Sequence, residues 1–179
     1  MQPGTHTVGP GEGTLQVKTY REGMAAKAGH DLIIEVTSWK ATVEAGEAPG
    51  ELAVELSADP RSLEVRDGHG GAKPLNDKDR ADINKSIDDK VLKGQAITFR
   101  STSVEGDSGG PVSMSGEVAM AGETRPISFQ LTIGSDGKVN GTIPLTQSDW
   151  GIKPYKGLMG ALKVRDEVEV VLDAQLPVG

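Results

Sequence analysis

The chain has no cysteine and few aromatic side chains, with two residues each of Trp, Tyr and Phe among its 179 residues. Without cysteine it forms no disulfide and offers no thiolate ligand. Its three histidines are scattered and belong to no cluster with Asp or Glu, so neither a metal site nor a cofactor is expected. The interior must therefore be lined mostly by aliphatic residues, which either fill a small core or leave a smooth apolar channel.

Long apolar runs and basic clusters are also missing. No stretch approaches the ~20 apolar residues of a membrane helix, so the protein is not expected to be membrane-embedded. Lys and Arg number 19 against 26 Asp and Glu, and this net charge of −7 argues against nucleic acid or an anionic membrane surface as a partner. The first residues, MQPGTHTVGPGEG, lack the basic start and apolar stretch of a signal peptide, so a cytoplasmic location is expected. The oligomeric state stays open, and a homodimer is one candidate.

What the chain does contain is a strong alternation of apolar and polar residues. A period of two places one face of a strand in an apolar interior and the other in water. Several such strands joined by tight turns form an antiparallel sheet, and its apolar face must be enclosed when the sheet curls. The clearest alternating sets are Val112, Met114, Val118 and Met120; Ile127, Phe129, Leu131 and Ile133; and Leu162, Val164, Val168 and Val170.

The pattern predicts a single all-β domain over residues 13–176, preceded by a flexible Gly/Pro-rich leader over residues 1–12. Eight strands are about the number that closes into a barrel with room for side chains or one apolar ligand. One helix over 76–92, with Ile83, Ile87 and Val91 as its apolar stripe, is expected to cover an opening of the barrel. The eight predicted strands are 13–19, 32–43, 52–56, 96–104, 111–121, 126–134, 138–148 and 162–174.

Several local features refine this prediction. In the strand 32–43 the apolar face changes phase, and a β-bulge near Ser38 would return both sets to one side. A helical turn within 20–29 is expected to end at Gly29 as its C-cap, and Asp136–Gly137 predicts a two-residue hairpin. The Gly-rich segment 62–75 is expected to be irregular.

A serine-protease motif is present without its partners. Residues 106–111 read GDSGGP, which resembles the nucleophile motif of chymotrypsin-like proteases. That chemistry needs a His base and a buried Asp, but His6 lies in the leader, His69 in a Gly-rich loop and His30 in an unrelated AGHDL context. The segment is instead predicted to be a polar hairpin loop, with no catalytic role for Ser108 and no enzyme activity.

An ordered set of motifs over 96–175 resembles the YceI-like family. Its pattern is P-x-I-x-F-x-S, then G-x-L-x-x-x-G-x-T-x-P, then [SR]-D-[FW]-G-I, then V-x-D-x-V-x-[IL]. The fit departs at AGHDL and at the helical insert. The matching residues are Ile97, Phe99 and Ser101; Gly116, Gly122, Thr124 and Pro126; Asp149, Trp150, Gly151 and Ile152; and Val164, Asp166 and Val168.

The resemblance implies a lipocalin-like antiparallel barrel that binds a polyisoprenoid or similar long apolar lipid along its axis. The alternative is a filled barrel with a structural or stress-response role and no ligand. The predicted interior consists of Leu15, Val17, Leu32, Ile34, Val36, Leu52, Val54, Phe99, Met114, Val118, Met120, Phe129, Leu131, Ile143, Leu145, Val164, Val168 and Val170.

The predicted ligand-binding residues combine part of this interior with a lid. His30 is a head-group candidate at the mouth, and its alternative role is a hydrogen bond to a nearby carbonyl. Lys153 is the second head-group candidate, in the loop DWGIKPYKGLMG; that loop either covers the opening or uses its Trp to plug one barrel end. The predicted lining and lid residues are Val36, Trp39, Phe99, Met114, Val118, Met120, Phe129, Leu131, Trp150, Tyr155, Leu158 and Met159.

Overall fold

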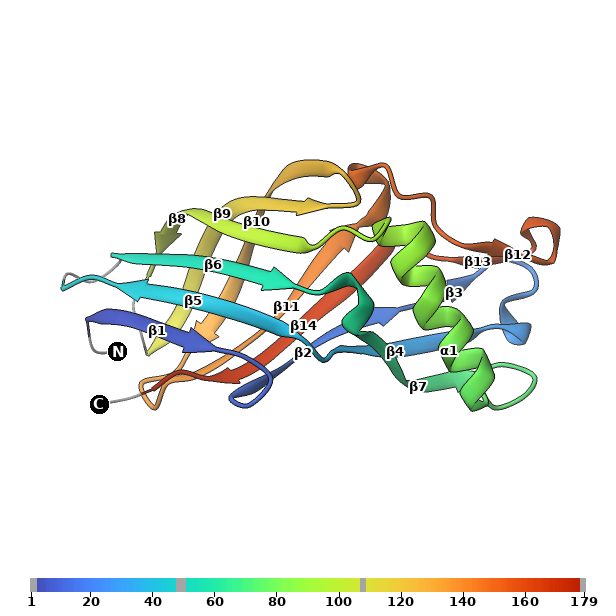
Figure 1. Ribbon diagram of the computed structural model, residues 1–179, viewed down its shortest axis with the longest axis horizontal. Helices are drawn as coiled ribbons and strands as arrows, with labels where there is room; N and C mark the ends of the chain where they lie inside the picture. Colours follow the sequence, from blue (N-terminus) through green and yellow to red (C-terminus); the bar gives the residue numbers. More distant parts are fainter. Residues whose placement is uncertain (1–2, 48–50, 107–108, 178–179) are drawn as a thin grey trace.

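The computed structural model describes residues 3–47, 51–106 and 109–177, and its main element is one large curled antiparallel sheet (Figure 1). The sheet has eleven strands rather than the eight predicted. In spatial order they are β1 (Gly4–Val8), β5 (Trp39–Ala45), β6 (Leu52–Ala58), β8 (Ile97–Glu105), β9 (Gly110–Met120), β10 (Glu123–Ile133), β11 (Lys138–Thr146), β14 (Glu167–Gln175), β2 (Gly13–Thr19), β4 (His30–Val36) and β7 (Leu63–Gly70).

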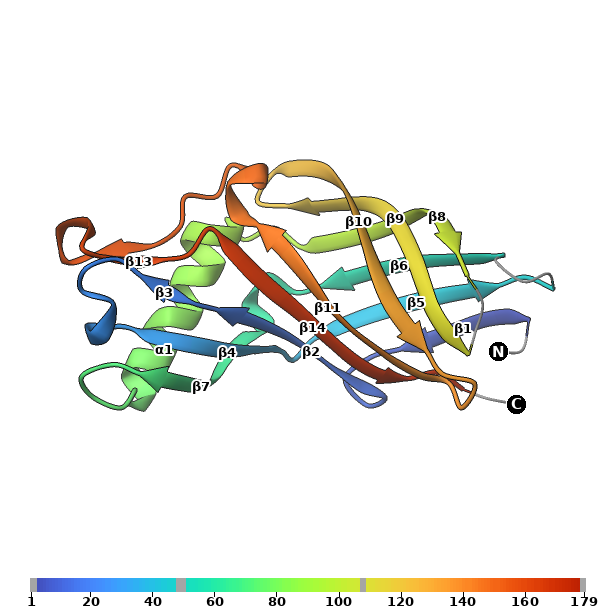
Figure 2. The same ribbon diagram turned by 180° about the vertical axis from the view of Figure 1, so that it is seen from behind.

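Three stretches of chain cross from one end of this order to the other. β1 continues into β2, β4 into β5, and β6 into β7, and in each pair the two strands lie in opposite halves of the sheet. The chain therefore connects the two outer groups of strands, β1–β5–β6 and β2–β4–β7, and the sheet curls on itself (Figure 2).

This crossing corrects the prediction of one bulged strand over 32–43. β4 ends at Val36 and pairs with β2 and β7, whereas β5 begins at Trp39 and pairs with β1 and β6. The chain exchanges partners at Thr37 and Ser38 instead of bulging. Val36 and Trp39 are both buried, so the two apolar sets do share the interior, as expected.

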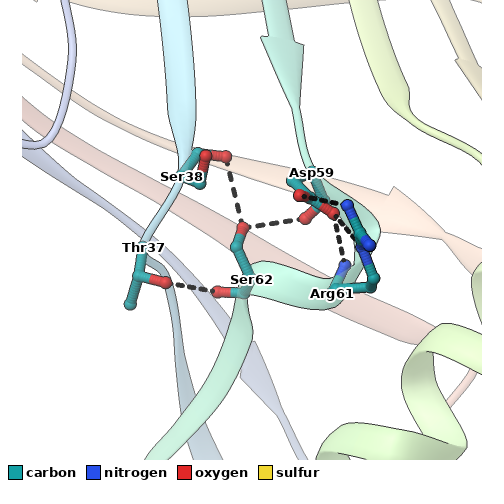
Figure 3. A network of polar contacts seen from close by, with 5 residues as sticks. All are labelled: Thr37, Ser38, Asp59, Arg61 and Ser62. Carbon is teal, nitrogen blue, oxygen red and sulfur yellow. Dashed lines mark hydrogen bonds and ion pairs between the residues drawn. The ribbon is translucent and has the colours of Figure 1, made fainter.

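A compact polar junction holds the two crossings together (Figure 3). The Thr37 backbone N–H donates to the Ser62 carbonyl at 2.8 Å, and the Asp59 N–H donates to the Ser38 carbonyl at 3.0 Å. The Ser62 hydroxyl lies 2.8 Å from the Asp59 carbonyl and 3.2 Å from that of Ser38. The Asp59 carboxylate also accepts from the guanidinium of Arg61 and, secondly, from its backbone N–H, and these bonds hold the pKa of that carboxyl below its ordinary value.

Other predicted boundaries were wrong because the pairing partner lies far away in sequence. Residues 4–8 of the expected flexible leader pair with β5, and residues 63–70 of the expected irregular segment pair with β4. The predicted strand 162–174 is two strands, since Arg165 donates its N–H to the Tyr20 carbonyl and Asp166 accepts from Ser148. A second sheet contains β12 (Lys156–Gly157), β13 (Leu162–Val164) and β3 (Arg21–Glu22).

The predicted helix is confirmed as α1 (Asp77–Ser86), with a π-helical continuation over Ile87–Leu92. Asn76 and Asp79 form a reciprocal capping box, in which Asn76 Oδ1 accepts from the Asp79 N–H at 2.8 Å and Asp79 Oδ2 accepts from the Asn76 N–H at 3.1 Å. The predicted apolar stripe of this helix packs against the core. No helix in the described ranges is long and apolar enough to cross a membrane.

The remaining helical segments are single 3₁₀ turns. They span Ala26–Ala28, Pro60–Ser62, Gln147–Trp150 and Leu158–Gly160. The first confirms the helical turn expected within 20–29, although Gly29 is extended, with φ of −100°, and is not a left-handed cap. The β10–β11 hairpin is also confirmed, but four residues, 134–137, separate its strands rather than two, and the Gly137 N–H donates to the Gly134 carbonyl at 2.9 Å to close the turn.

Candidate functional site

The curled sheet encloses an apolar cavity of about 860 Å³. All eleven strands of the main sheet contribute side chains to its wall, and the helix closes it with Ile83, Ile87 and Val91. Binding pockets for small organic molecules span roughly 300–1,000 Å³, so this cavity lies at the large end of that range. The arrangement follows from the sequence because strand alternation directs the aliphatic side chains to the inside of the curl.

The wall is the one that the alternation predicts: every residue of the predicted interior set lines the cavity. Phe99 and Phe129 form a tilted aromatic pair in this wall, with ring centroids 5.5 Å apart. Gly116 makes the pair possible, because a Cβ there would meet two ring carbons of Phe99 at 2.5 and 2.7 Å. Met114 and Met120 are buried on the same strand, β9, and also line the cavity.

The four predicted lid residues do not lie together at the mouth. Tyr155 lines the cavity and is 64% exposed, so it stands at the mouth. Trp150 is buried and is not among the described lining residues, and its indole Nε1 donates to the Val118 carbonyl at 2.9 Å, so it fastens its turn to β9. Met159 is fully exposed and also lies outside that lining. The side chain of Leu158 falls outside the described residues.

The two head-group candidates both reach the cavity. His30 lines it, but its Nε2 is 2.8 Å from the Lys73 carbonyl, so the alternative role expected for this residue is the one observed. Asp31 beside it accepts from the Arg21 N–H at 2.8 Å and lies 3.8 Å from the Arg21 guanidinium. Lys153 lines the mouth with no described ion pair.

Sequence reasoning missed most of the basic side chains at this mouth. Lys156 and Lys163 line it as direct cross-strand neighbours of β12 and β13, and Arg21 and Lys90 line it from β3 and the helix. Among the described lining residues the only acidic side chain is that of Asp82. No contiguous basic motif marks these positions, since they come from segments far apart in sequence.

Two further features concern polar groups near the wall. Trp39 lines the cavity, and its indole Nε1 is buried without a hydrogen-bond acceptor among the described residues. Buried donors are nearly always satisfied, so this nitrogen is unusual. Tyr20 donates its hydroxyl to Glu169 Oε2 at 2.7 Å, and this hydrogen bond, burial and the Glu169 charge raise the pKa of the phenol.

Two further sequence expectations concern a metal site and the serine-protease motif. Within the described ranges no three His, Asp or Glu side chains come together in a way that could hold a metal ion. β8 and β9, which flank the GDSGGP segment, pair antiparallel, as the predicted hairpin requires. Asp107 and Ser108 themselves lie outside the described residues.

Comparison with known proteins supports the fold. BcnA of Burkholderia cenocepacia superposes with a TM-score of 0.62 at 16% identity, covering 89% of this chain and 94% of its own. A YceI protein of Campylobacter jejuni superposes with a TM-score of 0.55 at 14% identity, covering 80% and 84%. No curated protein sequence matches the chain significantly. The YceI-like domain, however, matches residues 14–176, and the chain therefore belongs to the YceI-like family.

Proposed function

We propose that this protein binds a long apolar lipid, such as an isoprenoid, inside the sheet and carries or sequesters it without chemical change. The observation that carries the proposal is the cavity of about 860 Å³, whose wall is mainly aliphatic and aromatic and carries charged side chains chiefly at the mouth. The YceI-like membership supports the same ligand class, which the sequence resemblance already implied. A serine hydrolase is not proposed, because none of the three histidines stands in the sequence context that the serine-protease motif requires.

The energetics make the head group decisive for selectivity. Each CH₂ group removed from water contributes ~0.8 kcal/mol, so a long chain supplies ample affinity from water. A bilayer solvates the same chain equally well, and the transfer from a membrane therefore gains little from the tail. Contacts at the mouth and the length of the cavity must then distinguish one lipid from another.

The most direct test is to extract the purified protein with organic solvent and identify the bound lipid by mass spectrometry. A variant series then locates the site: Val118→Trp and Met120→Trp fill the cavity, whereas Glu117→Trp adds the same bulk on the exposed face of β9. We expect both interior variants to bind a fluorescent prenyl analogue at least tenfold more weakly, with little change in melting temperature. The Glu117 variant should bind like the wild type.

Strong destabilisation by the interior tryptophans would instead favour the alternative of a filled barrel without a ligand. Overpacking a filled core costs about 1–3 kcal/mol. Strong destabilisation by both interior tryptophans, together with no lipid in the extract and no probe bound by the wild type, would contradict lipid binding and favour a filled module. Labelling of the wild type, but not of Ser108→Ala, by an active-site serine probe would contradict the absence of catalysis.

A further inference from the structure

The exposed large apolar side chains of the described chain are confined to one end of the molecule. They are Met24, Tyr155 and Met159, with Met24 and Met159 completely exposed. All three lie on two segments that flank the cavity mouth, residues 20–29 and 151–165, which we call the tip segments. Figure 1 places β3, β12 and β13, which belong to these segments, at the end of the molecule farthest from β1, and Figure 2 shows β3 and β13 at the same end from behind.

The tip segments form one continuous surface although they are far apart in sequence. The Ala25 N–H donates to the Ala161 carbonyl at 2.9 Å, and Arg21 pairs with Val164 between β3 and β13. Met24 and Met159 thus project from neighbouring loops. Met159 has a φ of 54°, a left-handed conformation that bulky residues rarely adopt. Glycine or asparagine would fit this turn without strain, so folding alone does not explain an exposed methionine there.

The same segments carry a positive charge in an acidic protein. They contain six basic residues and one acidic residue, Glu22, while the whole chain has a net charge of −7. The adjoining segment 71–79 has two lysines and two aspartates and adds no net charge. The six basic residues of the tip segments are Arg21, Lys27, Lys153, Lys156, Lys163 and Arg165.

Protein contacts occupy only the two arginines of this set. The Arg21 guanidinium donates to the Gly29 and His69 carbonyls at 2.6 and 3.1 Å and lies 3.8 Å from the Asp31 carboxylate, which offsets its charge. The Arg165 guanidinium lies 5.8 Å from the centre of the Tyr20 ring. No ion pair in the described ranges involves the four lysines. Their ammonium groups remain available to an external anion.

We propose that the tip segments dock the protein on an anionic lipid bilayer, which the net charge of the whole chain argues against but the local charge of this surface favours. Exposed methionines enter the apolar region while flexible lysines beside them contact lipid phosphates, a combination typical of peripheral membrane binding. The cavity mouth would then face the bilayer, since Tyr155, Lys156 and Lys163 belong both to the tip segments and to the cavity lining. Docking itself needs only this surface; direct loading of a lipid from the bilayer rests on the proposed function.

Cosedimentation with vesicles tests the proposal. We expect the wild type to bind vesicles of phosphatidylcholine with phosphatidylglycerol, and to bind pure phosphatidylcholine at least tenfold more weakly. Lys153→Gln/Lys156→Gln/Lys163→Gln should weaken binding to the anionic vesicles at least tenfold, and Met24→Ser/Met159→Ser severalfold. The control Lys40→Gln/Lys85→Gln/Lys138→Gln removes the same charge from exposed positions elsewhere and should bind like the wild type.

Equal binding to neutral and anionic vesicles, no binding to either, or equal losses in the tip and control variants would overturn docking. Melting curves must first show that every variant is folded. A fluorescent prenyl analogue delivered without vesicles separates the two proposals. Wild type that takes up the analogue but ignores vesicles refutes docking alone, whereas wild type that binds anionic vesicles through the tip lysines but takes up no analogue refutes lipid carriage alone.

Discussion

Tyr20 links the cavity mouth to the main sheet through its hydroxyl, which donates to Glu169. The raised pKa of Tyr20 means that the folded protein holds the phenol proton more tightly than the unfolded chain. The resulting stability is fully present below pH 10, the ordinary pKa of the phenol, and is lost as the pH rises from there through the folded-state value.

This linkage gives a prediction for alkaline stability. The free energy of unfolding of the wild type should fall above pH 10, and Tyr20→Phe should reduce the steepness of that fall. Tyr155→Phe removes a hydroxyl from an exposed position and should leave the wild-type pH profile unchanged. Urea unfolding at a series of pH values from 8 to 11 measures the difference; parallel profiles for wild type and Tyr20→Phe would show that the hydrogen bond contributes no pH dependence.

In the strands, the sequence predicts residue by residue which side chains point into the interior. In the loops it does not. Val118 and Leu131 were identified because a strand alternates with a strict period of two. Trp150 follows β11 in a 3₁₀ turn, and Met159 lies in another turn, where no such period applies. The basic residues of the mouth escaped notice for a related reason, since only the fold brings Arg21 close to Lys163.

At the scale of elements, the junction around Ser62 is the feature that sequence periodicity could not reveal. A phase change near Ser38 is compatible with a bulge or with an exchange of pairing partners, and the choice depends on β7, which the glycines of 68–71 disguise. The helix was predictable because its cap, its first acidic turn and its apolar stripe are all local signals.

Removal of the Ser62 hydroxyl should weaken this junction measurably. Ser62 is 7% exposed, and its hydroxyl is shared by the carbonyls of Ser38 and Asp59. Those carbonyls also accept backbone N–H groups, so Ser62→Ala should lower the free energy of unfolding by only about 1 kcal/mol. Ser57→Ala, on the exposed face of β6, should change it by less than about 0.5 kcal/mol. Chemical denaturation measures the free energy of unfolding of both variants. Equal free energies would mean that the Ser62 hydroxyl contributes nothing to stability.

At the scale of the whole molecule, an occupied cavity links stability to ligand. Binding to the folded state alone adds about 2.7 kcal/mol when free ligand is a hundred times its dissociation constant. We therefore expect protein stripped of lipid to melt at a lower temperature than protein as purified, and added lipid to restore the difference. The cavity-filled Val118→Trp protein is the control, because it should melt at the same temperature before and after extraction.

The place of β2 between β14 and β4 determines when the protein can complete its fold. Tyr20 and Glu169, at the junction of these strands, are 149 residues apart in sequence. At 5–20 residues per second, a ribosome needs roughly 7 to 30 s to synthesise that interval. Throughout it β2 lacks its β14 neighbour, and this edge of the sheet stays unpaired. The nascent chain must therefore keep the inward face of β2 from aggregating until β14 emerges, because the sheet cannot be completed before then.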